Sequence, residues 1–326
     1  MTKKSRATLQ NIGAGFPPTR TAPPPALVPV STGGLYPRDY RRCLTEERRF
    51  LEVSEFDSTT VAYDGPTPFI GTAVHYHDGI RDDLLPKLGL DKAARYYEED
   101  PETHRFLGPL LHTITPNQSR FELDLNRPPD TTVYSQPDLA WGLDVWKTPL
   151  TQYEREFSME KWYEFHTMVD CAVEDAIRRF GYAVVFDFHS YNYQRKESVD
   201  WRTDGKPVIN LGTRHLKLDE RGQDIKDWFL ADIKKHTVAG EGCLVEENGV
   251  FYGGYLNRRL AHLFGPRVIT LSVEYKKVYM DERTGEMFED TTEDLVSQME
   301  STIHGLADHL GAPVRDGRSY RFCGEE

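Results

Sequence analysis

The chain has 326 residues, of which 38% are hydrophobic and 28% are charged, and its formal net charge is -12 at pH 7. This composition is typical of a globular protein that buries a large core. The acidic balance argues against binding to nucleic acid, and the short apolar runs argue against a membrane span. Because no apolar segment typical of a secretory signal follows the basic first residues, we expect a cytoplasmic protein.

The first part of the chain is rich in proline, with seven prolines between Met1 and Asp39. Such a composition predicts extended or partly disordered chain. We therefore expect residues 1–58 to form an N-terminal extension and residues 59–326 to form a single α/β domain. Acidic and apolar residues alternate in 50–64, which fits short edge or hairpin strands.

Segments with the pattern of strands alternate with segments with the pattern of helices along the rest of the chain. The expected strands are 66–75, 121–125, 182–186, 208–211 and 267–275, and the expected helices are 82–99, 158–180, 224–236, 255–264 and 292–310. This alternation predicts an α/β fold with a mixed, mostly parallel sheet flanked by helices on both faces.

The stretch Tyr182–Tyr193 (YAVVFDFHSYNY) is the most informative of these segments. It begins with an apolar run that is typical of a strand buried on both faces. Because side chains alternate along a strand, Asp187 and His189 share one side at its carboxyl end, where open α/β sheets usually bind ligands. The pair could be two metal ligands, a ligand and the residue that orients it, or a structural hydrogen-bonded pair.

Two other segments carry candidate chemistry. The sequence His75-Tyr76-His77-Asp78 follows an expected strand, and if it meets His189 the composition is that of a catalytic zinc site with an open water position. Glu274 lies inside the expected strand 267–275, where a carboxylate is costly unless it is paired or functional. Near a metal it would act as a general base, and otherwise it would form an ion pair with an arginine.

Arginines lie at turns near these segments. Arg120 and Arg127 bracket the expected strand 121–125, and Arg258 follows a pair of glycines. A guanidinium binds a carboxylate through two parallel hydrogen bonds, so arginines near a hydrolytic site indicate a carboxylate-bearing substrate. The sequence has no GxSxG elbow and no phosphate-binding glycine loop, which argues against nucleophilic serine catalysis.

Taken in order, these segments resemble the N-formylglutamate amidohydrolases, relatives of the zinc carboxypeptidases and aspartoacylases. The resemblance spans about residues 75–282 and is carried by His77-Asp78-Gly79, Ser119–Arg127 followed by two prolines, Asp187–Ser190, Asn210–Thr213, Gly253–Tyr255 with Arg258, and Glu274 followed by Tyr279–Asp281. It implies a zinc carboxypeptidase-like fold and a metal-dependent hydrolase that cleaves the C–N amide bond of an N-acyl amino acid.

The resemblance also implies roles for individual residues. It implies a Zn²⁺ ion held by His77, Glu102 and His189, with Glu274 as the general base and Asp187 as support for His189. The acidic ligand stays open between Glu102, Asp78 and Asp100, and the first histidine could be His75 in place of His77. The implied residues for binding the substrate are Arg120, Asn126, Arg127 and Arg258.

The expected substrate is a small molecule or a peptide that carries a carboxylate. Two segments depart from the family pattern: the cluster His75–Asp78 and the aromatic stretch Tyr191–Tyr193. These departures leave open whether N-formylglutamate itself is the substrate. The alternatives are a zinc peptidase or peptide-modifying hydrolase on the same scaffold, and a metal-free binding protein.

Overall fold

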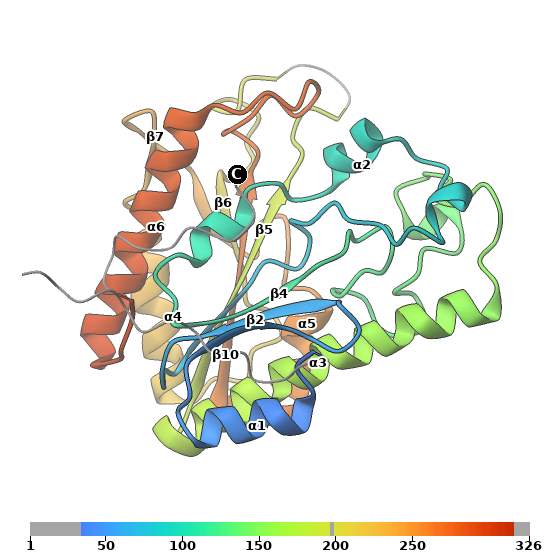
Figure 1. The fold of residues 1–326 in the computed structure, drawn as a ribbon. Coiled ribbons are helices and arrows are strands. Elements are labelled where there is room, and N and C mark those ends of the chain that lie inside the picture. The colour runs from blue at the N-terminus through green and yellow to red at the C-terminus, as the bar shows by residue number, and fades with distance from the viewer. Residues whose placement is uncertain (1–33, 196–198, 316–326) are drawn as a thin grey trace, which may run out of the picture.

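The computed structural model describes residues 34–195 and 199–315, which contain a main sheet in the order β1-β2-β4-β3-β5-β10-β6-β9 (Figure 1). The strands are β1 Phe50–Val53, β2 Thr59–Tyr63, β3 Phe69–Thr72, β4 His112–Pro116, β5 Ala183–Tyr191, β6 Ile209–Gly212, β9 Val245–Glu247 and β10 Val268–Lys276. A separate antiparallel pair consists of β7 Thr237–Val238 and β8 Glu241–Gly242. The central pairs β4–β3, β3–β5 and β5–β10 are parallel, which confirms the predicted mixed, mostly parallel sheet.

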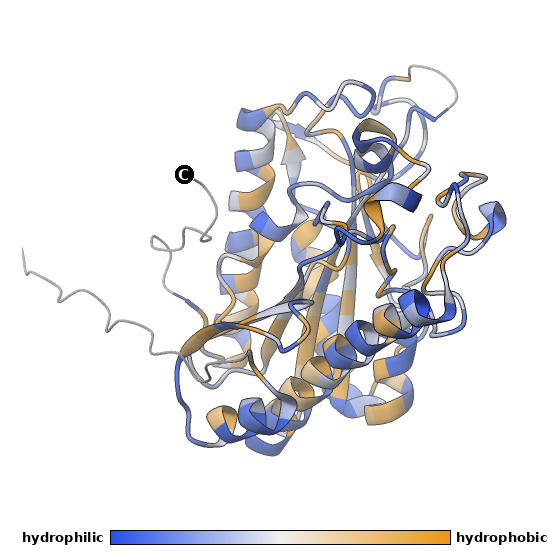
Figure 2. Ribbon diagram, turned by 45° about the vertical axis from the view of Figure 1, so that its right-hand side comes forward, coloured by the Kyte–Doolittle hydropathy of each residue, from blue (hydrophilic) through white to orange (hydrophobic). Residues whose placement is uncertain are grey.

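Helices cover both faces of this sheet. They are α1 Pro37–Thr45, α2 Lys92–Glu98, α3 Gln152–Phe180, α4 Glu220–Ile233, α5 Tyr255–Phe264 and α6 Glu289–Leu310, with short 3-10 segments η1 Leu85–Lys87, η2 Thr103–Leu107, η3 Pro137–Leu139 and η4 Gly265–Arg267. One buried cluster joins the sheet to α4 and α6, and a second joins it to α1, α3 and α5. Hydrophobic residues accordingly concentrate on the strands and on the helix faces turned toward them (Figure 2).

The central strand β5 is buried along its whole length, as its apolar run predicts. Val184, Phe186 and Phe188 pack into the cluster with α4 and α6. Val185 packs into the cluster on the other face. Because side chains alternate, the odd-numbered positions that follow, which include His189, face the side of α3 and α5.

The prediction of a strand over 121–125 is wrong, because this segment forms turns. The strand that lies between β2 and β3 in the sheet is β4, which precedes this segment in the sequence. Its alternation of apolar and acidic residues imitates a half-exposed strand, but the acidic side chains are buried. Glu122 lies against Lys161, with 3.0 Å between Oε1 and Nζ, and Asp124 contacts His75. The backbone N–H groups of Glu122 and Asp124 donate to the carbonyls of Ser119 and Thr132 and take no part in a sheet ladder.

Part of the predicted N-terminal extension belongs to the main fold. β1 pairs with β2 as an antiparallel hairpin, with Phe50 opposite Tyr63, and α1 packs against α3. The side chains of Tyr40 and Cys43 are buried in the core there. Residue 58 therefore does not mark a boundary of the fold, and residues 1–33 lie outside the described residues.

Local capping signals explain where two helices begin. α3 starts before the expected position 158 because Thr151 and Glu154 form a capping box, in which each side chain bonds the backbone of the other residue. The helix expected over 82–99 is reduced to η1 and α2. Asp91 caps α2 by accepting a hydrogen bond from the backbone N–H of Ala94, after the breaks that Pro86 and Gly89 introduce.

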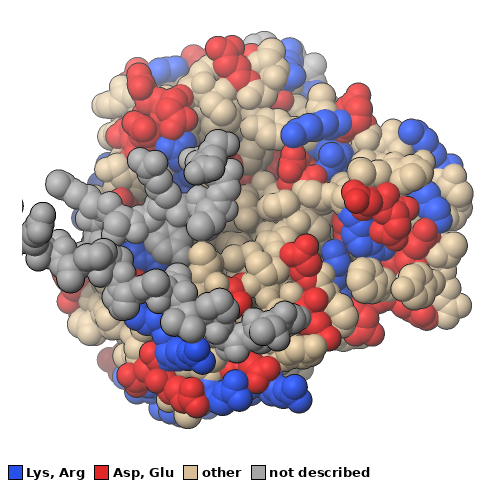
Figure 3. All heavy atoms as spheres, viewed as in Figure 1, with Lys and Arg blue, Asp and Glu red and all other residues tan. Residues whose placement is uncertain are grey.

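Within the described ranges, no helix is long and apolar enough to cross a membrane. On the face seen in Figure 3, acidic and basic side chains are interspersed and are not gathered by sign.

The packing of β5 generates a stability prediction. Phe186 is fully buried and its ring contacts the rings of Phe69, Phe188 and Phe229. Phe186→Ala should lower the free energy of unfolding by about 3–5 kcal/mol, because it removes apolar contacts and leaves a cavity. Urea denaturation measures this change. The control Phe288→Ala, at a side chain that is 44% exposed, should cost less than about 1 kcal/mol. Equal losses in the two variants would contradict the assigned core.

Candidate active site

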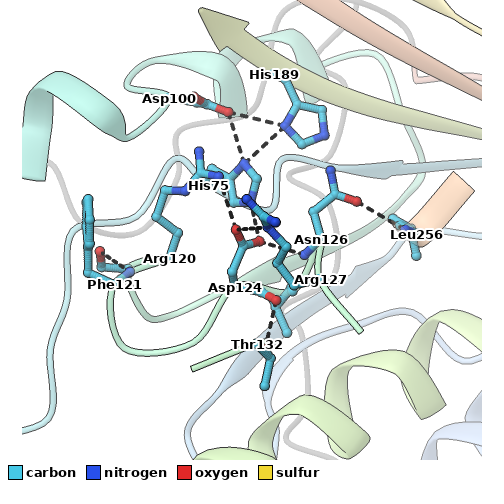
Figure 4. A network of polar contacts seen from close by, with 12 residues as sticks. His75, Asp100, Arg120, Phe121, Asp124, Asn126, Arg127, Thr132, His189 and Leu256 are labelled. Atoms are coloured by element: carbon cyan, nitrogen blue, oxygen red, sulfur yellow. Dashed lines mark hydrogen bonds and ion pairs between the residues drawn. The ribbon is translucent and has the colours of Figure 1, made fainter. Parts of the chain in front are cut away.

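Three polar side chains from separate parts of the chain meet at the carboxyl end of the central strands (Figure 4). His75 lies just beyond β3, Asp100 precedes η2, and His189 lies in β5. The backbone N–H of Asp100 donates to the carbonyl of His75 at 2.9 Å, which holds these two segments together. His75 Nδ1, Asp100 Oδ2 and His189 Nδ1 form a triangle with each side 3.2 Å long, and all three residues are buried.

The contacts on the far side of each imidazole indicate which nitrogen carries the proton. His75 Nε2 lies 2.7 Å from Asp124 Oδ1. His189 Nε2 lies 2.9 Å from Asp187 Oδ2, in an ion-pair contact whose geometry is poor for a hydrogen bond. Carboxylate oxygens only accept, so Nε2 is the protonated nitrogen and Nδ1 of a neutral ring presents a lone pair. Two imidazole lone pairs and Asp100 Oδ2 therefore converge, an arrangement that favours a cation between them.

The chemistry and spacing of these three atoms fit a divalent metal. Two imidazoles and one carboxylate form the donor set of one class of catalytic zinc site, in which a fourth position takes water. Donor atoms about 2.0–2.1 Å from a tetrahedral zinc lie about 3.3 Å from one another, which agrees with the 3.2 Å sides observed here. Among the residues that the structure describes, His75, Asp100 and His189 are the only such group.

Asp124 fixes the orientation of His75. Its buried carboxylate also accepts hydrogen bonds from the backbone of Asn126 at 2.8 Å, from Arg120 Nη2 at 3.1 Å and from the Tyr134 hydroxyl. Burial alone would raise the pKa of Asp124, but His75 and Arg120 hold that pKa well below its usual range. The carboxylate thus stays ionised and holds the ring, a common arrangement behind metal-bound histidines.

Carboxylates surround the two imidazoles and make the centre electronegative. Burial alone would raise the pKa of Asp100, but the neighbouring imidazoles of His189 and His75 hold that pKa far below its usual range. Burial opposes charge on His189, yet Asp187 and Glu274 raise its pKa well above the ordinary value. Both shifts have one cause, which is that this buried space favours positive charge at its centre.

Glu274 lies on β10 directly beside His189 in the parallel register. Its neighbours Val273 and Tyr275 pack into the core with α4 and α6, so Glu274 faces the opposite side, where it lines a cavity. It forms no hydrogen bond or ion pair with any residue of the described ranges, and burial raises its pKa to about 7. A carboxyl group with such a pKa can accept a proton and return it at neutral pH.

The cavity has a volume of about 420 Å³, and its lining includes His75, Asp100, Asp124, His189 and Glu274. Arg127 and Arg258 also line it. The Arg127 side chain is 38% exposed and its only ion pair in the described chain is a loose one, with Nε 3.7 Å from Asp124 Oδ2. The Arg258 guanidinium forms neither a hydrogen bond nor an ion pair with a described residue, although it lies near the ring of Tyr255. These donors are available to bind a carboxylate.

Two of the predicted metal ligands lie outside the cluster. His77 is only half-buried and its Nδ1 accepts a hydrogen bond from the backbone of Gly79 at 3.0 Å. Glu102 starts η2 with a left-handed backbone, and its Oε2 lies 3.5 Å from Arg105 Nη1. The residues two positions earlier, His75 and Asp100, take their places. The third candidate for the acidic ligand, Asp78, instead pairs with Lys92 at 2.9 Å.

Two of the predicted substrate-binding residues are engaged with the protein itself. Arg120 donates from Nε to Tyr134, from Nη1 to the carbonyl of Glu98 and from Nη2 to Asp124. Asn126 Oδ1 accepts a hydrogen bond from the backbone of Leu256 at 3.1 Å, in the first turn of α5. Both residues line the cavity, and these hydrogen bonds brace its wall.

Further residues line the cavity that the sequence pattern did not indicate: Trp141, Arg195, Tyr252 and Lys277. Lys277 is buried just past β10, and its Nζ donates to the carbonyls of Tyr97 and Glu99 at 2.7 Å each, which ties the segment before Asp100 to the end of the strand. In the sequence, Lys277 is recognisable only as a lysine that follows Glu274 by three positions. A lysine at a strand end is usually exposed, so that signal is weak.

Comparisons with known proteins give consistent results. A family model described as N-formylglutamate amidohydrolase matches residues 67–280. An N-formylglutamate deformylase from Pseudomonas aeruginosa is 26% identical over 226 residues, which cover 64% of this chain and 80% of that protein.

Solved structures show the same fold. The crystal structure of an N-formylglutamate amidohydrolase from Ralstonia eutropha JMP134 matches with a TM-score of 0.60 and 17% identity, covering 77% of this chain and 99% of that one. The crystal structure of gene product Atu2144 from Agrobacterium tumefaciens matches with a TM-score of 0.54 and 16% identity, covering 76% of this chain and 96% of that one. The family match spans most of the chain and contains the buried cluster, Glu274 and both available arginines. The chain therefore belongs to the N-formylglutamate amidohydrolase family, hydrolases that act on C–N amide bonds.

Proposed function

We propose that the protein is a zinc-dependent deformylase that hydrolyses the amide bond of an N-formyl amino acid or a close N-acyl relative. The observation that carries the proposal is the triangle of His75 Nδ1, Asp100 Oδ2 and His189 Nδ1 beside Glu274, in one cavity with available arginines. Family membership supports the reaction class, and the three donor atoms support the metal.

His75, Asp100 and His189 would hold the metal ion. When bound there, zinc supplies a Lewis acid and lowers the pKa of a water molecule. Asp124 and Asp187 keep the Nε2 atoms of the two histidines protonated, so that each Nδ1 lone pair faces the centre.

Glu274 moves the proton in the proposed reaction. It takes a proton from the attacking water and gives it to the leaving amine, which then departs as the amino group of the amino acid. Arg127 and Arg258 bind the substrate carboxylate, and Arg120 and Asn126 contribute through the wall that they brace. The products are formate, or another carboxylate, and the free amino acid.

The ligand assignment predicts different outcomes for two neighbouring histidines. In chelator-treated protein, His75→Ala should weaken zinc binding by more than about 100-fold, since loss of even an outer hydrogen-bond partner of a ligand costs about 10–100-fold. His77→Ala should bind zinc like the wild type. Isothermal titration with zinc chloride measures both affinities. The reverse pattern would restore His77 as the ligand, and failure of the wild type to take up zinc would refute the metal site.

The role of Glu274 predicts a loss of rate without a loss of metal. Glu274→Gln should lower kcat by about 10²–10⁴-fold on N-formyl amino acids, because the amide cannot accept the proton from water. Its zinc content, measured by elemental analysis, should equal that of the wild type. Wild-type kcat with retained zinc in this variant would exclude Glu274 as the base.

The same role predicts the pH dependence of the reaction. A base works when it is ionised, so kcat/KM of the wild type should fall as the pH decreases through the pKa of Glu274. That pKa is about 7 without a metal, and a bound cation would move it lower. The acidic limb of the profile should therefore have its midpoint at or below about 7. An acidic limb unchanged in position in Glu274→Gln would assign it to another group.

A further inference from the structure

The cavity contains an exposed aromatic side chain that the proposed reaction does not use. Trp141 lines the cavity and is 44% exposed. Ligand pockets are lined mainly by apolar and aromatic side chains, so an indole ring that is exposed within a cavity can contact the apolar part of a ligand. The cavity volume of about 420 Å³ also lies in the range that accommodates ligands larger than a formylated aliphatic amino acid.

The structure fixes this ring in position. Trp141 has a left-handed backbone with φ of 54°, which a bulky residue adopts only when its surroundings impose it. The edge of its ring packs against Tyr134, with 6.0 Å between ring centroids. The guanidinium carbons of Arg120 and Arg195 lie 4.7 and 6.0 Å from the indole centroid. The ring is thus held before any ligand binds, which reduces the ordering cost of binding.

The two cations beside the ring are already neutralised. Arg120 donates to Asp124, and Arg195 binds both carboxylate oxygens of Glu98 at 2.6 Å. They therefore support the indole ring but do not offer an unpaired charge to a second carboxylate on the ligand. This side of the cavity favours an uncharged planar group.

A cation with available donors lies close by. The guanidinium carbon of Arg127 is 6.0 Å from the ring centroid of Tyr134, the same ring that packs against Trp141. Arg127 and Trp141 are therefore both neighbours of Tyr134. An α-carboxylate and the side chain of one amino acid could contact this pair together.

We propose that Trp141 forms a subsite for a planar apolar side chain, so that the preferred substrates are N-formyl derivatives of aromatic amino acids with their carboxylate at Arg127. This inference rests on the proposed deformylase function and names its substrate class. Stacking against the indole ring adds to the burial of apolar area, and the effect of one such aromatic contact corresponds to about a tenfold change in affinity.

Binding to a slowed enzyme tests the subsite without relying on turnover. In zinc-loaded Glu274→Gln protein, isothermal titration should show that N-formylphenylalanine binds more tightly than N-formylalanine and N-formylglutamate. Adding Trp141→Ala should weaken N-formylphenylalanine by about tenfold and leave N-formylalanine unchanged. Trp141→Phe should retain most of the aromatic preference. The matched surface control is Tyr153→Ala, at an α3 side chain that is 74% exposed and lies outside the residues lining the cavity.

The outcomes separate this inference from the function on which it rests. Equal losses for the aromatic and aliphatic ligands in Trp141→Ala, or tighter binding of N-formylglutamate than of N-formylphenylalanine, would overturn the subsite. Aromatic preference in kcat/KM of the wild type, lost in Trp141→Ala, would support it. If the wild type hydrolyses no N-formyl amino acid, the deformylase proposal fails, and the binding difference still decides whether Trp141 forms an aromatic subsite.

Discussion

The arrangement of this protein depends on keeping several carboxylates inside a buried space at the end of its sheet. An unpaired buried charge is very costly, so each carboxylate needs a donor or a cation. Asp124 has four donors, Asp100 contacts two histidines and Asp187 contacts one. Glu274 alone among these four forms no such contact within the described chain. This difference in partners distinguishes Asp100, Asp124 and Asp187 from Glu274. The pKa of Glu274 is about 7, so this residue can accept and release a proton at neutral pH.

The sheet supplies the positions from which these groups meet. On β5 and β10 the apolar residues of one parity fill the core with α4 and α6, and His189 and Glu274, which belong to the other parity, line the cavity near the carboxyl ends of the strands. A slip of one residue in β5 would place Phe188 at the cavity and His189 in the apolar core. The aromatic packing of Phe186 therefore keeps the strand in register and, through it, keeps His189 beside Glu274.

Much of this could be predicted because apolar periodicity is local. The runs in β5 and β10 and the helical spacing in α5 identify those elements directly. The choice between His75 and His77, or between Asp100 and Glu102, could not be made in this way. Each pair is separated by two positions, so an alternating pattern treats both members alike. The contacts that distinguish them come from elsewhere: Asp124 reaches His75 across 49 positions of sequence, and Asp100 bonds the backbone of His75.

The hydrogen bond from the backbone of Leu256 to Asn126 Oδ1 has a consequence for the mechanics of the cavity wall. It joins the loop that carries Arg127 to the first turn of the helix that carries Arg258. Gly254 packs so closely on Asn126 that a Cβ atom there would lie 2.1 Å from its amide nitrogen. Two segments more than a hundred residues apart in the sequence are thus held in a fixed relative position. Arg127 and Arg258 are carried by these two segments, so their spacing is set before a carboxylate binds between them. Little of the binding free energy would then be lost in ordering the two segments.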